Sequence, residues 1–334
     1  MTSMDSVKKR TGKEKVRVAM IGAGDMANKV HYPSLASFDD VEFAAICDLD
    51  NGRMNATADR YGIVKRYADY RRMIEDLEPD AVYAIGQPHL MYDVWVWCLE
   101  NRRNLFIEKP MGLTLHQARS LEYLAGKHGC ITQVGFQRRS CPLLVNMREA
   151  CLKKGPIVHA ACEFYKCATT PFLGSRDHTM DDCVHSIDTV RWMCGGEVVE
   201  VQSRCRRVGV PNINWIGATL HFDNGSTGFI INSWSSGRRV FRVQMHAPGI
   251  CTDAEVEGKA ILYADGDYAG VEYDTRAVAG SEELFVYGGF RAKNREFIDS
   301  VKIGSETTSS PFRDAVKTME VAEKILARDV LGNA

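Results

Sequence analysis

The strongest constraint on the fold is the segment VRVAMIGAGDMA at residues 16–27, where an apolar run ends in a glycine turn. A strand that feeds such a turn into a helix makes an anion site, because the first backbone N–H groups and the helix dipole face the anion. The first glycine permits the tight turn, the second lets phosphates approach the backbone, and a small third residue lets helix and strand pack closely. We therefore predict a site for a dinucleotide pyrophosphate at Gly22, Gly24, Asp25, Met26 and Ala27.

An acidic residue stands where this type of site requires one. Asp48 follows Ala27 by 21 residues and ends a second apolar run, VEFAAICD. Its carboxylate would accept hydrogen bonds from the adenosine ribose, which favours NAD. Arg53 could reach a 2′-phosphate, so NADP stays open as the alternative. The other interpretation is a glycine turn that binds nothing.

Composition excludes several classes of protein. The 334 residues are 45% hydrophobic and carry 42 basic against 43 acidic side chains, as in a soluble protein of two domains. The balanced charge gives no reason to expect nucleic acid or a membrane surface as partner. No apolar run is long enough for a membrane span, and residues 1–14 are expected to form a flexible leader without a signal core.

The eleven cysteines are odd in number and include no C-x-x-C pair. Several lie inside apolar patterns, which indicates free buried thiols in a reducing compartment rather than disulfides. We therefore expect a cytoplasmic location. No spacing matches a zinc pattern, so no metal site is predicted.

Residues 15–135 alternate between strand and helix patterns and predict a nucleotide-binding domain with a doubly wound parallel sheet, the Rossmann arrangement. Apolar strand-like runs occupy 16–21, 41–47, 80–85, 104–107 and 131–135, and helical patterns lie near 25–38, 51–61, 69–77, 90–101 and 114–128. Ligands of such sheets lie beyond the carboxyl ends of the strands. Besides the glycine turn and Asp48, these ends carry Gln87, Pro88, Glu108 and Lys109 as candidate cofactor contacts.

Residues 136–334 predict a second, α+β domain for substrate binding and assembly. One helix near 180–194 precedes several β-rich segments, and the sequence HFDNGS at 221–226 predicts a hairpin with an Asn-Gly turn. Consecutive strands without helices between them imply a mostly antiparallel sheet. Helices near 291–302 and 311–328 close the chain, and the last could pack back on the first domain. Without a flexible linker, the two domains should enclose a cleft.

Two short motifs carry candidate chemistry. Lys109 ends a buried strand, where its ammonium could donate a hydrogen bond to a substrate oxygen while Glu108 holds it or touches the nicotinamide ribose. The alternative is a strand-end salt bridge. Asp181 and His185 are four residues apart, so on a helix they share a face; the histidine could remove a hydroxyl proton and the carboxylate orient its ring. The alternative is a buried histidine on an apolar helix face.

The order of these motifs resembles the glucose–fructose oxidoreductase/inositol dehydrogenase/rhizopine-catabolism (Gfo/Idh/MocA) family. The resemblance runs from about residue 15 to the helix at Asp314-Ala315, through GxGxxA, His31-x-Pro33, Cys47-Asp48, Glu108-Lys109-Pro110, VGFQRR at 134–139 and D-x-x-x-H at 181–185. It implies a Rossmann domain followed by a domain with a large open sheet, which often joins subunits into homodimers or homotetramers. It also implies hydride transfer between NAD(P) and a secondary hydroxyl of a sugar, inositol or related polyol.

By the same resemblance Lys109, Asp181 and His185 would form a catalytic triad, with Arg138 or Arg139 near the substrate. The chain departs from the family where relatives carry a glycine triplet and this sequence has Ser175-Arg176-Asp177-His178. Arg176 could meet an anionic substituent there. Two alternatives stay open: an enzyme that retains NAD and uses transient sugar oxidation for elimination or hydrolysis, and a sensor of dinucleotide or sugar without turnover.

Overall fold

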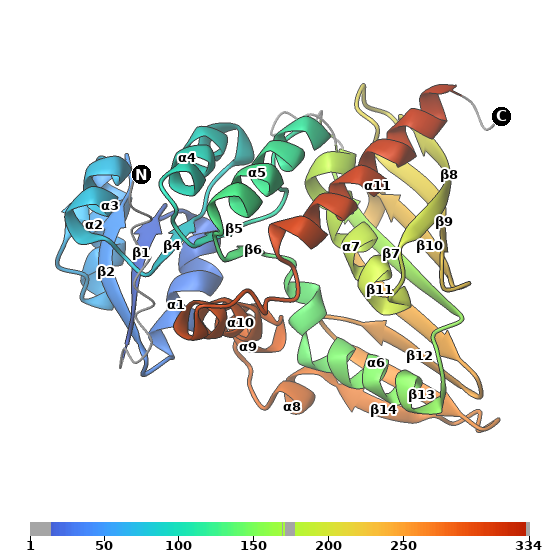
Figure 1. The fold of residues 1–334 in the computed structure, drawn as a ribbon. Coiled ribbons are helices and arrows are strands. Elements are labelled where there is room, and N and C mark those ends of the chain that lie inside the picture. Colours follow the sequence, from blue (N-terminus) through green and yellow to red (C-terminus); the bar gives the residue numbers. More distant parts are fainter. Residues whose placement is uncertain (1–14, 169, 171–177, 332–334) are drawn as a thin grey trace, which may run out of the picture.

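Two sheets, side by side and joined by helices, make up the protein (Figure 1). The computed structural model describes residues 15–168, 170 and 178–331. The first sheet is parallel throughout, with strand order β3-β2-β1-β4-β5-β6. Its strands are β1 (Val16–Ile21), β2 (Val41–Cys47), β3 (Arg66–Tyr67), β4 (Ala81–Ala84), β5 (Leu105–Ile107) and β6 (Thr132–Val134). The predicted doubly wound sheet is confirmed, and β3, only two residues long, is the strand that the sequence did not reveal.

The helices of this half follow the glycine turn and the strand ends. They are η1 (Ala27–His31, a π-helix) continuing into α1 (Tyr32–Ala36), then α2 (Asn51–Tyr61), α3 (Tyr70–Leu77), α4 (Pro88–Glu100) and α5 (Leu115–His128). Local capping explains where they begin: the side chain of Asp50 accepts from Arg53 N–H, and Thr114 from Gln117 N–H. These helices coincide with the helical patterns predicted from the sequence.

The second sheet has eight strands in the order β14-β13-β12-β11-β7-β10-β9-β8. They are β7 (His159–Cys167), β8 (Val198–Arg206), β9 (Trp215–Phe222), β10 (Thr227–Ser233), β11 (Ser235–Ala247), β12 (Ile250–Glu255), β13 (Lys259–Ala264) and β14 (Val271–Asp274). Only the β7–β10 pair is parallel, so the expected large, mostly antiparallel sheet is confirmed. The hairpin at 221–226 also forms, between β9 and β10.

Some helices of the second half cover one face of this sheet, and others pack against the first half. They are η2 (Gln137–Ser140), α6 (Pro142–Lys154), η3 (Thr179–Cys183, a π-helix), α7 (Val184–Cys194), α8 (Thr275–Ala279), α9 (Leu284–Tyr287), α10 (Phe290–Ile303) and α11 (Phe312–Leu331). In Figure 1, α6, α7 and α11 lie against the same face. The opposite face carries the half-exposed side chains of Phe229 and Ile231.

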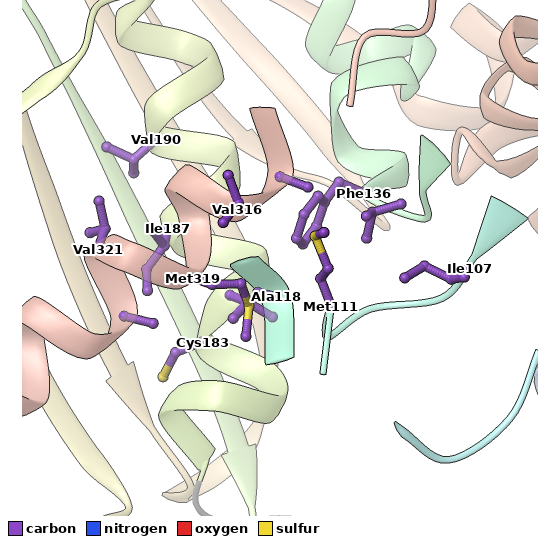
Figure 2. Close-up of a cluster of buried hydrophobic side chains, with 14 of the residues drawn as sticks. Ile107, Met111, Ala118, Phe136, Cys183, Ile187, Val190, Val316, Met319 and Val321 are labelled. Atoms are coloured by element: carbon purple, nitrogen blue, oxygen red, sulfur yellow. The ribbon is translucent and has the colours of Figure 1, made fainter. Parts of the chain in front are cut away.

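A shared hydrophobic core fixes the two halves relative to each other. Helix α11 packs on both α5 and β8, while α10 packs on α1 and η1. Figure 2 shows part of one continuous cluster that includes Ala118 of α5, Ile187 of α7 and Met319 of α11. All three side chains are fully buried. The strand ends of the first sheet are therefore held rigidly against η3 and α7 of the second half.

Candidate active site

The glycine turn after β1 has the shape that close packing demands. Gly22 has φ +105°, and a Cβ there would lie 2.0 Å from the carbonyl oxygen of Ile85. Any side chain at this position would collide with the end of β4. At Gly24, by contrast, a Cβ would meet no atom within 4 Å. The backbone at Gly24 therefore faces open space at the beginning of the helix, where an anion can approach.

The next three residues divide between surface and core. Asp25 and Met26 are exposed at the helix start, and Ala27 is fully buried beneath them. The N–H of Asn28 donates to the carbonyl of Gly24 at 3.0 Å, so the preceding N–H groups lie at the helix N-terminus, without the helical acceptors that later residues have. This arrangement fits a pyrophosphate.

Asp48 lies at the end of β2 beside the turn. Its Oδ2 accepts from Ala23 N–H at 2.7 Å and its Oδ1 from Asp50 N–H at 2.8 Å. Each carboxylate oxygen keeps a second lone pair, so the orientation fixed by the backbone leaves acceptors for ribose hydroxyls. The exposed Arg53 guanidinium lies 3.8 Å from Asp48 Oδ1.

Gln87 and Pro88 lie at the end of the neighbouring strand β4. Gln87 is the exposed N-cap residue of α4, and Pro88 occupies its first turn. A Cβ at Gly86 would lie 2.9 Å from the Met91 side chain, so helix and strand approach closely here. Gln87 is thus presented at the same sheet edge as Gly22 and Asp48.

Lys109 bridges the two halves of the protein. Its Nζ donates to the carbonyl of Asp181 at 3.1 Å and to Asp182 Oδ1 at 3.2 Å, while Asp181 Oδ1 lies 3.9 Å away. Burial alone would lower the pKa of Lys109, but attraction to Asp182 and Asp181 outweighs it and raises the pKa above its usual value. Lys109 is therefore a cation held at the junction between strand end and helix. The Lys109–Pro110 peptide bond is cis.

Glu108 does not reach the Lys109 ammonium. Its buried carboxylate receives the backbone N–H of Lys109 at 3.3 Å and lies 2.9 Å from His31 Nε2. The first of the two roles predicted for Glu108, holding Lys109, is thus compatible with the structure through the backbone rather than through the ammonium.

Asp182 is the residue that sequence reasoning missed. It pairs with Lys109 and with Lys166 of β7, and Trp234 Nε1 donates to its Oδ2 at 3.3 Å. Although burial raises the pKa of this carboxyl, Lys109 and Lys166 lower it far more, so Asp182 is ionised. The sequence MDDCVH shows that a second acid, Asp182, follows Asp181 directly. The four-residue spacing to His185 nevertheless favoured Asp181.

His185 is the second residue of α7, and the helical segment before α7 is not a regular α-helix. The sequence predicted one helix near 180–194, whereas η3 is a π-helix up to Cys183 and α7 starts at Val184. The wider turn changes the expected alignment of Asp181 with His185. Within the described residues, His185 Nδ1 is buried and has no hydrogen-bond partner. Asp181 therefore makes no hydrogen bond to this nitrogen, and its role in orienting the ring stays a prediction.

The electrostatic surroundings of His185 keep its ring neutral. Burial lowers its pKa well below the usual value, and the positive charges of Lys109 and Arg138 lower it further against the opposing effect of Asp182. The ring of Phe164 lies 6.4 Å away in an edge arrangement. A neutral imidazole has a free lone pair with which it can accept a proton.

The arginines predicted to lie near the substrate differ in their surroundings. Arg138 is buried with its guanidinium 4.6 Å from the Phe241 ring centroid, near enough to act on His185. Arg139 is instead a structural residue: it forms ion pairs with Asp188 at 2.5 Å and Asp314 at 2.7 Å, so its interpretation as a substrate ligand is not supported. Arg176 lies outside the described residues.

The cysteines form no disulfide bonds. All eleven cysteines are free thiols, most of them buried. Across residues 15–168, 170 and 178–331, no three His, Cys, Asp or Glu side chains gather in a way that could hold a metal ion. Over the same residues, no helix combines the length and apolar character needed to cross a membrane.

Comparison with known families now decides the relationship. Residues 16–136 match the family model described as "Oxidoreductase family, NAD-binding Rossmann fold", and residues 165–248 match the "GFO/IDH/MocA C-terminal domain". The chain belongs to the Gfo/Idh/MocA family. It is therefore an oxidoreductase of a family that uses NAD.

Individual relatives of this Gfo/Idh/MocA protein are distant. It is 26% identical to scyllo-inositol 2-dehydrogenase (NAD(+)) of Bacillus subtilis over 66% of this chain and 68% of the relative. It is 32% identical to D-glucoside 3-dehydrogenase of Escherichia coli, over 37% of this chain and 35% of the relative. The crystal structure of a dehydrogenase from Chromobacterium violaceum has the same fold, with a TM-score of 0.85, 18% identity and 96% of each chain covered.

Proposed function

We propose that this protein transfers a hydride between NAD and a secondary ring hydroxyl of a sugar, inositol or related polyol. The observation that carries the proposal is that a neutral, half-buried His185 lies within electrostatic reach of a cationic Lys109, at the edge where the first sheet meets η3. A base and a hydrogen-bond donor of this kind are what alcohol oxidation requires. The names of two relatives, an inositol and a glucoside dehydrogenase, support the same class of substrate.

The cofactor fits the residues at the sheet edge. Gly22, Gly24 and the helix start at Asp25–Ala27 would hold the pyrophosphate, Asp48 the adenosine ribose, and Gln87 and Pro88 would flank the dinucleotide. NAD, when bound, supplies the hydride acceptor. Side chains of this protein would remove the hydroxyl proton and stabilise the charge on the oxygen.

In the proposed reaction the neutral ring of His185 takes the hydroxyl proton. The Lys109 ammonium donates a hydrogen bond to the same oxygen and stabilises its developing negative charge. Asp182 and Asp181 keep Lys109 charged and in place. Arg138, beneath the site, opposes protonation of His185 before the substrate binds.

The test measures NADH formation by absorbance with a panel of inositols, aldoses and methyl glycosides. Lys109→Ala and His185→Ala are expected to lose on the order of 10²-fold or more in turnover, as general acid–base groups do. His116→Gln, an exposed residue on α5, is the matched control. Unchanged turnover in both folded variants would contradict the assignment, and a wild-type protein that binds NAD yet turns over no polyol would contradict the proposed function.

A further inference from the structure

His31 has a setting that the proposed reaction leaves unexplained. It ends η1, the helix whose beginning faces the pyrophosphate site, and is only 1% exposed. The ring of Phe106 lies 5.2 Å away and that of Phe290 6.4 Å away, both in edge arrangements. A histidine so enclosed by aromatic rings must find its hydrogen-bond partners inside the protein.

Both ring nitrogens of His31 face oxygen atoms. Nε2 lies 2.9 Å from Glu108 Oε1, and Nδ1 lies 3.2 Å from Asn294 Oδ1. The orientation of the Asn294 amide is fixed, because its Nδ2 donates to the carbonyl of Phe290 at 2.9 Å. The amide oxygen therefore points at His31, and Nδ1 must carry a proton.

The contact with Glu108 then needs a second proton. A ring protonated only at Nδ1 presents a lone pair at Nε2, and a lone pair cannot face an ionised carboxylate at 2.9 Å without repulsion. Either Nε2 carries the proton or Glu108 does. The two buried side chains thus share one proton beyond those that neutral histidine and ionised glutamate hold.

Glu108 has a second hydrogen-bond contact, on its other oxygen. Oε2 accepts the backbone N–H of Lys109, and Glu108 is one of the carboxylates whose attraction outweighs burial and raises the pKa of Lys109. A Cβ at Gly135 would lie 2.4 Å from Oε1, so the carboxylate fits only because a glycine is there. The His31 ring thus lies between a carboxyl oxygen and an amide oxygen, an arrangement in which both ring nitrogens can donate.

We propose that His31 is a positioning residue that, as an imidazolium, pairs with the buried Glu108 carboxylate. The pair holds the backbone of Lys109, which donates to Glu108, close to the end of η1. The role rests on the proposed function. One end of the helix then meets the pyrophosphate, and its other end fixes the strand end that carries Lys109. Asn294 of α10 supplies the third support, from a helix that belongs to the second half of the chain.

A direct test of the charge state does not depend on turnover. Nitrogen NMR of histidine-labelled protein at neutral pH should show His31 with both ring nitrogens protonated, the signal being assigned by its loss in His31→Gln. In Glu108→Gln the amide can donate to Nε2, so His31 should become neutral. A neutral His31 in the wild-type protein would overturn the proposal, whatever the enzyme's activity.

The positioning role is tested by kinetics. His31→Gln should lower kcat on the order of 10²-fold, as a small misplacement of a reacting group does. Its dissociation constant for NADH should stay within about threefold of wild type, because the glycine turn and Asp48, which would hold the pyrophosphate and the adenosine ribose, are unchanged. The double variant with Glu108→Gln should be no slower than the worse single variant, because both changes break one pair.

Each result separates this inference from the proposed function. Wild-type kcat in a folded His31→Gln protein, or additive losses in the double variant, would overturn the positioning role while leaving the dehydrogenase intact. If no polyol is oxidised but NMR shows both ring nitrogens of His31 protonated in the wild type and not in Glu108→Gln, the proposed function is wrong and the buried ion pair is confirmed. His116→Gln serves as control throughout.

Discussion

Lys109 lies closer to Asp182 than to Asp181: its Nζ is 3.2 Å from the nearest carboxylate oxygen of Asp182 and 3.9 Å from that of Asp181. Asp182 is also the less exposed of the two. The acid that controls the charge of Lys109 is therefore the residue next to the one that motif spacing indicates.

We expect Asp182→Asn to shift the pH dependence of the proposed reaction. Without this carboxylate, burial is less opposed and the pKa of Lys109 falls. The basic limb of the kcat/KM profile should move to lower pH, and turnover should fall on the order of 10²-fold as Lys109 loses its anchor. Asp181→Asn is the matched comparison and should move the limb less. An equal or larger shift with Asp181→Asn would show that distance to Lys109 does not decide the effect.

The pKa of His185 gives a second prediction. Because burial, Lys109 and Arg138 all lower it, the acidic limb of the kcat/KM profile should lie below about pH 6.5, the ordinary histidine value. In Lys109→Met one of the positive charges is gone and the pKa should rise. Titration of the His185 ring by NMR measures this directly, with His116 as an exposed reference. No upward shift in Lys109→Met would contradict the electrostatic account.

The same group links stability to pH. His185 is held neutral when folded, so below about pH 6.5 the unfolded chain binds a proton that the folded chain does not. Its contribution to stability is fully present above that pH and is lost as the pH falls. His185→Gln should therefore flatten the fall in the free energy of unfolding between neutral and mildly acidic pH, as urea denaturation would show. If the dependence of the unfolding free energy on pH is unchanged in His185→Gln, other groups cause the loss of stability at mildly acidic pH.

Local patterns made much of the first half predictable. Strand and helix alternation up to residue 135 gave the parallel sheet, because each buried strand is a short apolar run with polar residues at its carboxyl end. The roles of Gly22 and Ala27 also follow from local geometry, since one must avoid Ile85 and the other must fit beneath the helix. The apolar runs and the glycine turn are visible within a few residues of the chain, although the carbonyl that Gly22 must avoid lies on the neighbouring strand end.

The side chains proposed to be catalytic were harder to place because their partners are far away in sequence. Lys166 and Trp234 meet Asp182 from β7 and from the connection after β10, which no spacing rule reports. Residues Thr179–Cys183 form the π-helix η3, so four-residue spacing does not give the alignment of Asp181 with His185 that a regular α-helix would. Arg138 and Arg139 are adjacent in sequence, yet only the fold shows that Arg139 forms ion pairs with Asp188 and Asp314.

The two glycines of the turn should respond differently to alanine. Gly22→Ala places Cβ against the carbonyl of Ile85 at a φ of +105°, so we expect a loss of about 3 kcal/mol or more in unfolding free energy. Gly24→Ala meets no protein atom and should unfold near the wild-type temperature. Its affinity for NADH should still fall about 10-fold or more, because the methyl group occupies the approach of the pyrophosphate. Thermal unfolding and NADH fluorescence titration separate the two effects, and normal NADH binding by Gly24→Ala would place the pyrophosphate elsewhere.

Asp48 and Arg53 should together decide the cofactor preference. Asp48→Ser removes the carboxylate that would meet the adenosine ribose and that lies 3.8 Å from the Arg53 guanidinium. Arg53 keeps its ion pair with Asp50 at 3.1 Å, and its exposed guanidinium can also pair with a 2′-phosphate. Such a charge-assisted contact is worth about 1.5–3 kcal/mol, or about 10- to 100-fold. The ratio of kcat/KM for NADP to that for NAD should rise by this factor. Adding Arg53→Ala to Asp48→Ser should abolish the gain, since the serine alone offers the phosphate no positive charge; a gain that persists without Arg53 would show that the preference comes from removing repulsion by Asp48 alone.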